Sequence, residues 1–294
     1  ELWDALGVRA SVERMTKDGI AVPSNVTAML ERGRESFYEG KLAEQTYFDL
    51  VGQRVEKVPQ DERHLYLPKL KEDGTRVVKK NLGASLVDLG DGALCLEVHT
   101  KMNTIDDDVI QMLVAAREEA EKSFEALVIG NDGGNFGAGA NLMLVMMGAK
   151  SGQWDMIEKA ISGLQSALQG LRYAKVPVVA APFGLTLGGC AEAAMAADAC
   201  QAHAETYMGL VEVGAGVVPG GGGCLRMVER WTGPTEGVDN VVLLPFVAAP
   251  SLNIAQAKVA TGAPEAKKLR YLAETDGISL NRDLLLYEAK QRAL

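Results

Sequence analysis

The sequence has little of the side-chain chemistry on which metal centres, disulfide frameworks and imidazole catalysis depend. Its 294 residues include only 3 histidines and 4 cysteines, and aromatic residues make up 5%. The cysteines are far apart and form no C-x-x-C pair, which argues against both a zinc site and a set of disulfides. The histidines lack the spacing of metal ligands, so we expect neither a bound metal nor a catalytic imidazole.

Long apolar runs and an excess of positive charge are also missing. The longest apolar stretches, 176–185 and 241–250, contain proline and are well short of the roughly 20 residues that cross a membrane. No basic segment followed by an apolar one opens the chain, as a signal peptide would. Lys and Arg number 30 against 39 Asp and Glu, a net charge of −9, which argues against a nucleic-acid partner. We therefore expect a cytoplasmic protein without a membrane span.

Glycine, by contrast, is abundant, with 32 residues. No phosphate-binding G-x-x-x-x-G-K-[ST] and no nucleophile G-x-S-x-G occurs, so the glycines do not form those sites. They gather in three loops, at 133–140, 184–189 and 214–223. Taken singly, each loop is most simply a tight turn. Two such loops at helix N-termini could also aim backbone N–H groups at one point, which suits an oxyanion that develops on a carbonyl oxygen.

Apolar patterning predicts the architecture of the larger part of the chain. Short apolar strands are expected at 85–89, 93–99, 126–130 and 176–181. An apolar stripe with helical spacing runs through 157–171. Strands that alternate with helices indicate an α/β fold with parallel pairing.

Charge divides the chain into two parts. Residues 1–85 carry equal numbers of basic and acidic residues, so the net charge of −9 lies in 86–294. Two short helices are expected within 1–40. The highly charged stretch that follows contains prolines and glycines, and we predict a linker over 41–84. The main domain is then 85–294.

Two glutamates are isolated from other charges. Glu192 is the only charged residue between Lys175 and Asp198, and Glu212 is the only one between Glu205 and Arg226. A carboxyl group among Gly, Ala, Val and Leu is expected to be desolvated, which raises its pKa and suits proton transfer. The alternative for each is a structural carboxylate that accepts hydrogen bonds from backbone N–H groups at a helix start.

Several segments, in order and spacing, resemble the enoyl-CoA hydratase/isomerase (crotonase) family. They are Lys101-Met-Asn103, Asn135-Phe-Gly-Ala-Gly-Ala-Asn141, Lys175–Ala181, Leu187-Gly-Gly-Cys-Ala-Glu192, Gly209-Leu-Val-Glu212 and Val218–Gly223. Asn141 stands where the family usually has Asp, and the loop before Glu192 has fewer glycines than is usual. The resemblance implies an α/β spiral of ββα turns with a helical C-terminal region.

The start of the chain has a resemblance of its own. Glu1-Leu-Trp-Asp-Ala-Leu-Gly-Val8 resembles the end of a 3-hydroxyacyl-CoA dehydrogenase C-terminal helical domain. Residues 1–40 are therefore expected to be a remnant of that domain. This resemblance implies the C-terminal part of a bifunctional protein, in which NAD would belong to the absent dehydrogenase domains.

The crotonase resemblance also implies roles for individual residues. The N–H groups of Ala140 and Gly189 would form an oxyanion hole for a thioester oxygen. Glu192 and Glu212 would flank the C2–C3 bond of the substrate, and Gly220 would help to hold the water. Lys101, Asn103 and Ala138 would bind coenzyme A, and Lys258, Lys267 and Lys268 are further candidates for phosphate contact.

The presence of both glutamates favours hydration of trans-2-enoyl-CoA to 3-hydroxyacyl-CoA in fatty-acid β-oxidation, with no cofactor beyond the CoA of the substrate. One alternative is a 3-enoyl-CoA isomerase or a combined hydratase and isomerase. Another, of a different class, is a non-catalytic acyl-CoA-binding module of a β-oxidation complex. The resemblance further implies a homo-oligomer and a thiolase partner.

Overall fold

The computed structural model describes residues 2–294, without the side chains of 142–144. The chain forms two compact units, one that ends at Glu62 and one of Arg63–Leu294. The predicted remnant over 1–40 lies in the first unit, and its residue 1 lies outside the described part. Among residues 2–294, no helix has the length and apolar character needed to cross a membrane.

The first unit combines three short helices with a small antiparallel sheet. These elements are α1 (Leu2–Leu6), α2 (Val8–Lys17), α3 (Ser24–Glu31), β1 (Tyr38–Glu39), β2 (Thr46–Asp49) and β3 (Arg54–Lys57), with a 3-10 turn η1 (Leu42–Glu44). Val8, Val26, Met29 and Phe48 form its small core. The buried guanidinium of Arg34 donates to the backbone oxygens of Ser36 and Thr46, which ties the helices to the sheet.

The predicted linker over 41–84 is wrong for much of that range. It contains β2 and β3 of the first unit, followed by α4 (Leu67–Lys71) and β4 (Val77–Lys80) of the second. Charge and proline content suggested a linker, but the apolar side of β2 is buried through Phe48. The second unit accordingly begins at Arg63, before residue 85, where the main domain was expected to start.

The second unit is built on a seven-stranded sheet in the order β12-β10-β8-β7-β6-β5-β4. The strands not yet given are β5 (Ala84–Gly90), β6 (Ala93–Val98), β7 (Ala126–Ile129), β8 (Val178–Ala180), β10 (Ala199–His203) and β12 (Gly277–Ser279). The strands from β6 to β12 pair in parallel, and β4 and β5 add an antiparallel edge. The α/β prediction and the four predicted strands are therefore confirmed.

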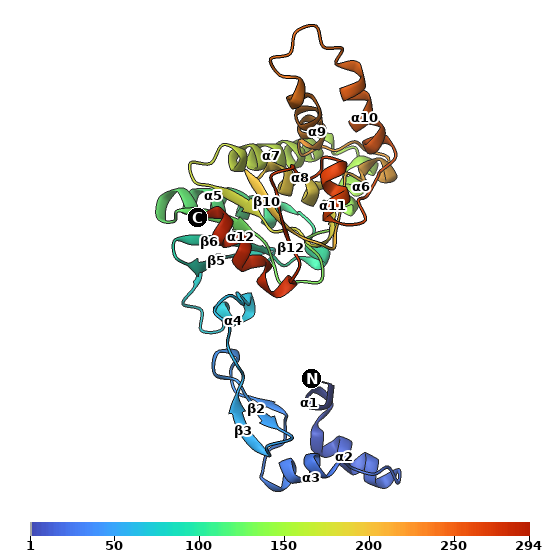
Figure 1. The fold of residues 1–294 in the computed structure, drawn as a ribbon. Helices are drawn as coiled ribbons and strands as arrows, with labels where there is room; N and C mark the ends of the chain where they lie inside the picture. The colour runs from blue at the N-terminus through green and yellow to red at the C-terminus, as the bar shows by residue number, and fades with distance from the viewer. Residues whose placement is uncertain (1) are drawn as a thin grey trace. The chain divides into compact units, whose positions relative to one another are not determined.

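The further helices of this unit are α5 (Asp107–Ser123), α6 (Leu142–Lys150), α7 (Trp154–Arg172), α8 (Gly189–Ala196), α9 (Gly223–Thr232), α10 (Leu244–Ala255), α11 (Ala263–Lys268) and α12 (Leu285–Ala293). Helices α5, α8 and α12 pack against the sheet, whereas α10 extends away from it beside α9, as Figure 1 shows. Short 3-10 turns complete the unit: η2 (Lys101–Asn103), η3 (Glu212–Ala215), η4 (Gly233–Thr235) and η5 (Arg282–Leu284). The apolar stripe predicted over 157–171 lies within α7, whose Leu164, Leu168 and Leu171 are buried.

A second, two-stranded parallel sheet holds the loops that matter for function. It pairs β9 (Gly184–Leu187) with β11 (Thr206–Gly209). Strand β9 leads directly into α8, and β11 leads through two residues to η3. Because the strands are parallel and in register, the starts of α8 and η3 emerge at the same edge of this sheet.

Candidate functional site

Two glycine-rich loops lie side by side at this edge. The Gly137 N–H donates to Leu185 O at 2.9 Å, and the Leu187 N–H donates to Gly137 O at 3.0 Å, so residues 136–140 run along β9. A Cβ added at Gly139 would lie 3.3 Å from Leu187 O and 3.7 Å from Gly189 N. Such close approach of two backbones explains why this loop is rich in glycine.

The two predicted oxyanion donors lie together here. A Cβ added at Gly189 would be 3.6 Å from Ala140 N, which places the two backbone segments in contact distance of one another. Within residues 2–294, neither the Ala140 N–H nor the Gly189 N–H has an acceptor. The Gly189 N–H belongs to the first turn of α8, where N–H groups have no intrahelical partner and carry the positive end of the helix dipole. The geometry therefore leaves two donors free for a ligand oxygen.

Glu192 follows one turn after Gly189 on α8, and its side chain is only 3% exposed. Its carboxylate accepts from the Gly221 N–H at 2.8 Å and 2.9 Å and from the Gly223 N–H at 2.7 Å. Burial raises the pKa of Glu192, and these backbone hydrogen bonds oppose the rise because they favour the ionised form. A Cβ added at Gly221 would lie 2.5 Å from Glu192 Oε2, so only glycine fits there.

Glu212 starts η3 and approaches the same loops from the other strand. A Cβ added at Gly188 would be 3.3 Å from Glu212 Oε1 and 3.5 Å from Gly139 Cα. Both carboxylate oxygens are buried, and neither has a hydrogen-bond partner among the described residues. Burial, with a smaller contribution from the charge of Glu192, raises the pKa of Glu212 to about 7.

The two carboxyl groups thus differ in environment, which separates their roles. Glu192 is held by backbone donors that stabilise its charge, whereas Glu212 has none of these donors and is half protonated near neutral pH. A pair of titratable groups whose surroundings differ in this way suits one base and one acid. The alternative that each is a structural carboxylate held by backbone N–H groups fits the contacts of Glu192 but not those of Glu212.

The unpartnered carboxylate of Glu212 has a consequence for stability. Its pKa is raised from 4.5 to about 7 on folding, so the native state binds more protons than the unfolded state between these values. The contribution of Glu212 to stability is therefore present below pH 4.5 and is lost as pH rises through about 7. We expect Glu212→Gln to be stabilised relative to wild type by on the order of 1–2 kcal/mol at pH 8, after allowance for partial solvent access.

Urea unfolding at pH 5, 6, 7 and 8 measures this effect, with Glu236→Gln at an exposed position as the matched control. The difference in the free energy of unfolding between Glu212→Gln and wild type should grow with pH. The difference between the control and wild type should not change with pH. Equal pH dependence in all three proteins would contradict the assignment of an unpartnered buried carboxyl group.

The other predicted site residues fall into two groups. Gly220 and Ala138 lie beside the site: the Gly220 carbonyl accepts from Gln165 Nε2 at 2.7 Å, and the Ala138 N–H donates to Met102 O at 3.1 Å. Asn103 is half-buried, and its Nδ2 donates to Asn135 O at 2.8 Å, so its side chain braces the glycine-rich loop. Lys101 is exposed at the start of η2.

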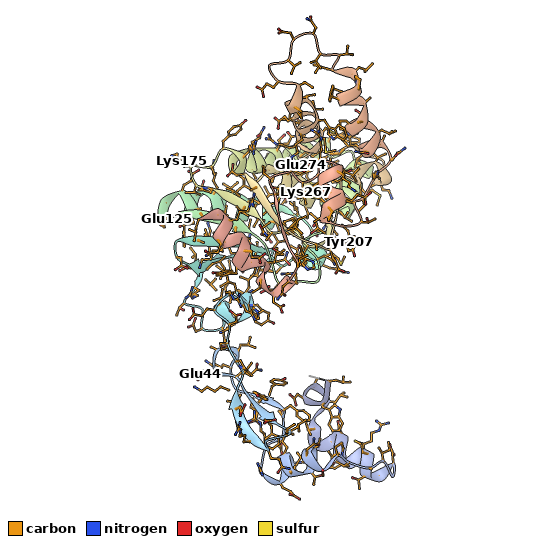
Figure 2. All side chains as sticks on the ribbon, in the orientation of Figure 1. Glu44, Glu125, Lys175, Tyr207, Lys267 and Glu274 are labelled. Atoms are coloured by element: carbon orange, nitrogen blue, oxygen red, sulfur yellow. The ribbon has the colours of Figure 1, made fainter. Side chains whose placement is uncertain are left out.

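The lysines proposed as further phosphate contacts differ in whether they are free or bound within the chain. Lys258 and Lys268 are exposed, but Lys267 Nζ donates to the backbone oxygen of Glu274 at 2.8 Å. Figure 2 labels both Lys267 and Glu274, which lie close together near α11. Lys267 is therefore engaged within the chain, whereas Lys258 and Lys268 extend into solvent.

A cavity of about 670 Å³ opens beside Glu192. Glycines 220–222 and residues of helices α7, α8 and α9 line it. Its apolar lining comprises Ile161, Leu168, Ala196, Val217, Val218 and Leu225. This volume lies within the usual range for ligand pockets, about 300–1,000 Å³.

Sequence reasoning did not identify the groups that hold these residues in place. The carboxylate of Glu192 accepts from the N–H groups of Gly221 and Gly223, whereas the predicted Gly220, within the described part of the chain, makes no hydrogen bond to it. The run of four glycines before α9 was the available signal, but it does not say which N–H groups point at Glu192. Among residues 2–294, no cluster of three or more His, Cys, Asp or Glu has the arrangement of a metal site.

Comparison with known families and proteins shows which of them the chain resembles. A family model described as enoyl-CoA hydratase/isomerase matches residues 93–244. The chain is 41% identical over 293 residues to a probable 3-hydroxyacyl-CoA dehydrogenase of Bacillus subtilis, covering 100% of this chain and 36% of that protein. It is 30% identical over 216 residues to a putative fatty acid oxidation complex trifunctional enzyme of Rickettsia felis, covering 73% of this chain and 28% of that one. The chain thus spans about a third of these relatives' length.

Solved structures share the fold. An enoyl-CoA hydratase from Bacillus anthracis aligns with a TM-score of 0.57 at 20% identity over 72% of this chain and 75% of its own. Another from Polaromonas aligns with a TM-score of 0.60 at 19% identity, over 71% and 75%. At these identities the likeness concerns the fold alone, and it confirms the predicted crotonase-like architecture of the second unit.

Proposed function

The chain belongs to the enoyl-CoA hydratase/isomerase family, and we propose that its site adds water across the double bond of trans-2-enoyl-CoA. The observation that carries this proposal is the convergence of two free N–H groups, at Ala140 and Gly189, with two carboxyl groups in different environments. The N–H groups stabilise negative charge on an oxygen, and the carboxyl groups move protons. Hydration of an activated double bond needs both.

Water attacks C3 of the enoyl thioester, and the electron pair of the C2–C3 double bond moves toward the thioester oxygen. The N–H groups of Ala140 and Gly189 donate to that oxygen as its negative charge grows, an effect worth ~3–4 kcal/mol per donor in comparable sites. The proton lost by water and the proton gained at C2 balance, so the product is a 3-hydroxyacyl thioester. No electron acceptor takes part.

Glu192 is proposed as the base that takes the proton of water, and Glu212 as the acid that delivers a proton to C2. Backbone donors favour the ionised form of Glu192 against the rise that burial causes in its pKa, and the pKa of about 7 leaves Glu212 partly protonated at neutral pH. Gly220 is proposed to help hold the water, since it lines the cavity beside Glu192. The two groups act as a coupled unit through one shared water.

We propose that the chain binds the coenzyme A part of its substrate. Lys101 is exposed on η2 next to Met102, whose carbonyl accepts from the Ala138 N–H, and is suited to contact its phosphates, with Ala138 beside the adenine. Exposed Lys258 and Lys268 are further candidates for phosphate contact. Asn103 is proposed to act indirectly, since its side chain braces the loop at Asn135.

A panel of enoyl-CoA substrates tests the proposed reaction. Incubation with trans-2-enoyl-CoA, followed by chromatography of the products, should yield 3-hydroxyacyl-CoA. Formation of shifted enoyl isomers without a hydroxyacyl product would favour the isomerase alternative. Binding of the CoA ester without turnover of any substrate would favour the non-catalytic module.

The same panel tests the role of the cavity. We expect kcat/KM to rise about fourfold for each methylene added between four and eight carbons, since each buried methylene is worth ~0.8 kcal/mol. Ile161→Ala should reduce the gain in kcat/KM for each added methylene, because Ile161 lines the cavity. A preference for four carbons over eight would show that the acyl chain does not enter it.

The wider context is also a proposal. The relatives named above carry dehydrogenase or fatty acid oxidation names, and hydration yields the 3-hydroxyacyl thioester on which such a dehydrogenase would act. We propose that this chain supplies the hydration step of fatty-acid β-oxidation within a longer protein. The expected homo-oligomer, the thiolase partner and the origin of residues 1–40 stay predictions.

A further inference from the structure

Cys190 lies immediately after Gly189 on α8, and its side chain contacts the glycine-rich loop. It is 4% exposed. The Gly139 N–H donates to Cys190 Sγ at 3.4 Å, and the thiol has two backbone acceptors, Asn103 O at 3.4 Å and Gly139 O at 3.7 Å. A Cβ added at Gly137 would overlap the same sulfur. The thiol therefore fills the space between α8 and the loop.

The peptide that links Gly139 to Ala140 explains why these contacts matter. Its carbonyl oxygen accepts from the Ile105 N–H at 2.9 Å and lies within reach of the Cys190 thiol. In a planar trans peptide the N–H points opposite to the C=O. Fixing the Gly139 carbonyl toward Ile105 and Cys190 thus aims the Ala140 N–H the other way, into the site.

We propose that Cys190 is a positioning residue that sets the spacing between the two N–H groups of the oxyanion hole. It is covalently next to one donor, Gly189, and hydrogen-bonded to the loop that carries the other, Ala140. The inference rests on the proposed hydratase function, because it assigns those N–H groups to the thioester oxygen. Oxyanion donors act only when they are held close to the position that the charged oxygen takes.

The chemistry of the thiol fits this role and argues against a nucleophile. Burial raises the pKa of Cys190 to about 12, so the group stays a neutral thiol that can both donate and accept. A thiolate here would place a negative charge behind the loop that stabilises the developing oxyanion.

Cys190→Ala tests the proposal, with Cys200→Ala as the matched control. Cys200 is equally buried, and its thiol donates to Ala194 O at 3.3 Å, also on α8 but near its other end. We expect Cys190→Ala to lower kcat for hydration about 10- to 100-fold with little change in KM, as small displacements of catalytic groups do. Cys190→Ser, which keeps a donor and acceptor, should recover part of the loss, and Cys200→Ala should retain near wild-type kcat.

A spectroscopic readout separates positioning from general loosening of the fold. The C=O stretch of an isotope-labelled enoyl-CoA bound to the protein reports polarisation of the thioester by the two N–H groups. Its shift to lower frequency should shrink in Cys190→Ala and persist in Cys200→Ala, at temperatures where circular dichroism shows both variants folded. Equal kcat and equal frequency shifts in the two alanine variants would overturn the proposal.

Failure of the inference and failure of the proposed function give different results. If wild type hydrates enoyl-CoA and the two alanine variants behave alike, only the role of Cys190 is wrong. If wild type shows no hydration and no shift of the bound thioester frequency, the proposed function itself is wrong.

Discussion

Glu192→Gln and Glu212→Gln are each expected to lower kcat for hydration of a trans-2-enoyl-CoA by about 10²–10⁴-fold, the usual contribution of a positioned acid or base. The substitutions keep the shape of each side chain and remove its proton chemistry. Glu192 lies in the first turn of α8, and Glu212 approaches the loop at Gly188. Stopped assays of 3-hydroxyacyl-CoA formation measure the effect, and circular dichroism checks the fold.

Controls make this result specific to the pair. Glu236→Gln changes an exposed carboxylate and should leave kcat unchanged. The kcat of the double variant should be only slightly below that of the less active single variant, because groups that act as a unit do not contribute additively. Turnover near the wild-type rate in either single variant would contradict the two-carboxyl mechanism.

The pH dependence of kcat/KM tests which of the two glutamates is the acid. If Glu212 is the acid, kcat/KM of wild type falls as pH rises through about 7, since the group loses the proton that it must deliver. The residual activity of Glu212→Gln should lack this alkaline limb. A profile in which activity instead rises through pH 7 would reverse the assignment and make Glu212 the base.

Gly189→Pro is expected to lower kcat about 10²–10³-fold, as removal of one oxyanion donor does elsewhere. Proline lacks the N–H, yet it is well tolerated at the first helical position, where that group has no intrahelical partner. Gly189 is the first residue of α8, so the substitution removes the donor with small cost to the helix. Steady-state kinetics with one enoyl-CoA measure the loss.

Gly189→Ala is the matched control for this change. It retains the N–H, and its Cβ would lie 3.6 Å from Ala140 N and Ile105 Cδ1, which are ordinary contacts. The alanine variant should therefore lose far less activity than the proline variant. Equal losses in both would show that bulk at this position, and not the missing donor, is responsible.

Much of the site could be predicted because its signals are local in sequence. Glu192 and Glu212 are each the only charge in a long apolar or glycine-rich stretch, with one glycine loop just before Glu192 and another just after Glu212. The strands of the main sheet follow from apolar runs such as 126–129. Order and spacing of these features carried the family resemblance, which the family model confirms.

What could not be predicted depends on contacts between distant segments. The bonds from Gly221 and Gly223 to Glu192 join residues about 30 positions apart, and the contact of Cys190 with Asn103 spans 87. The strands within 41–84 were missed because charged side chains on the exposed face of a short strand look like linker composition. Pairing of β9 with β11, which brings Glu212 to the loop, leaves no local signal either.

A crystal structure with a non-hydratable enoyl-CoA analogue bound would show directly how the substrate lies between the N–H groups and the carboxyl groups. We expect the thioester oxygen to lie about 2.7–3.1 Å from both the Ala140 and the Gly189 nitrogens. We also expect the carboxyl groups of Glu192 and Glu212 to flank C2 and C3. A thioester bound with its oxygen away from both nitrogens, or with either carboxyl group out of reach of these carbons, would contradict the proposed mechanism.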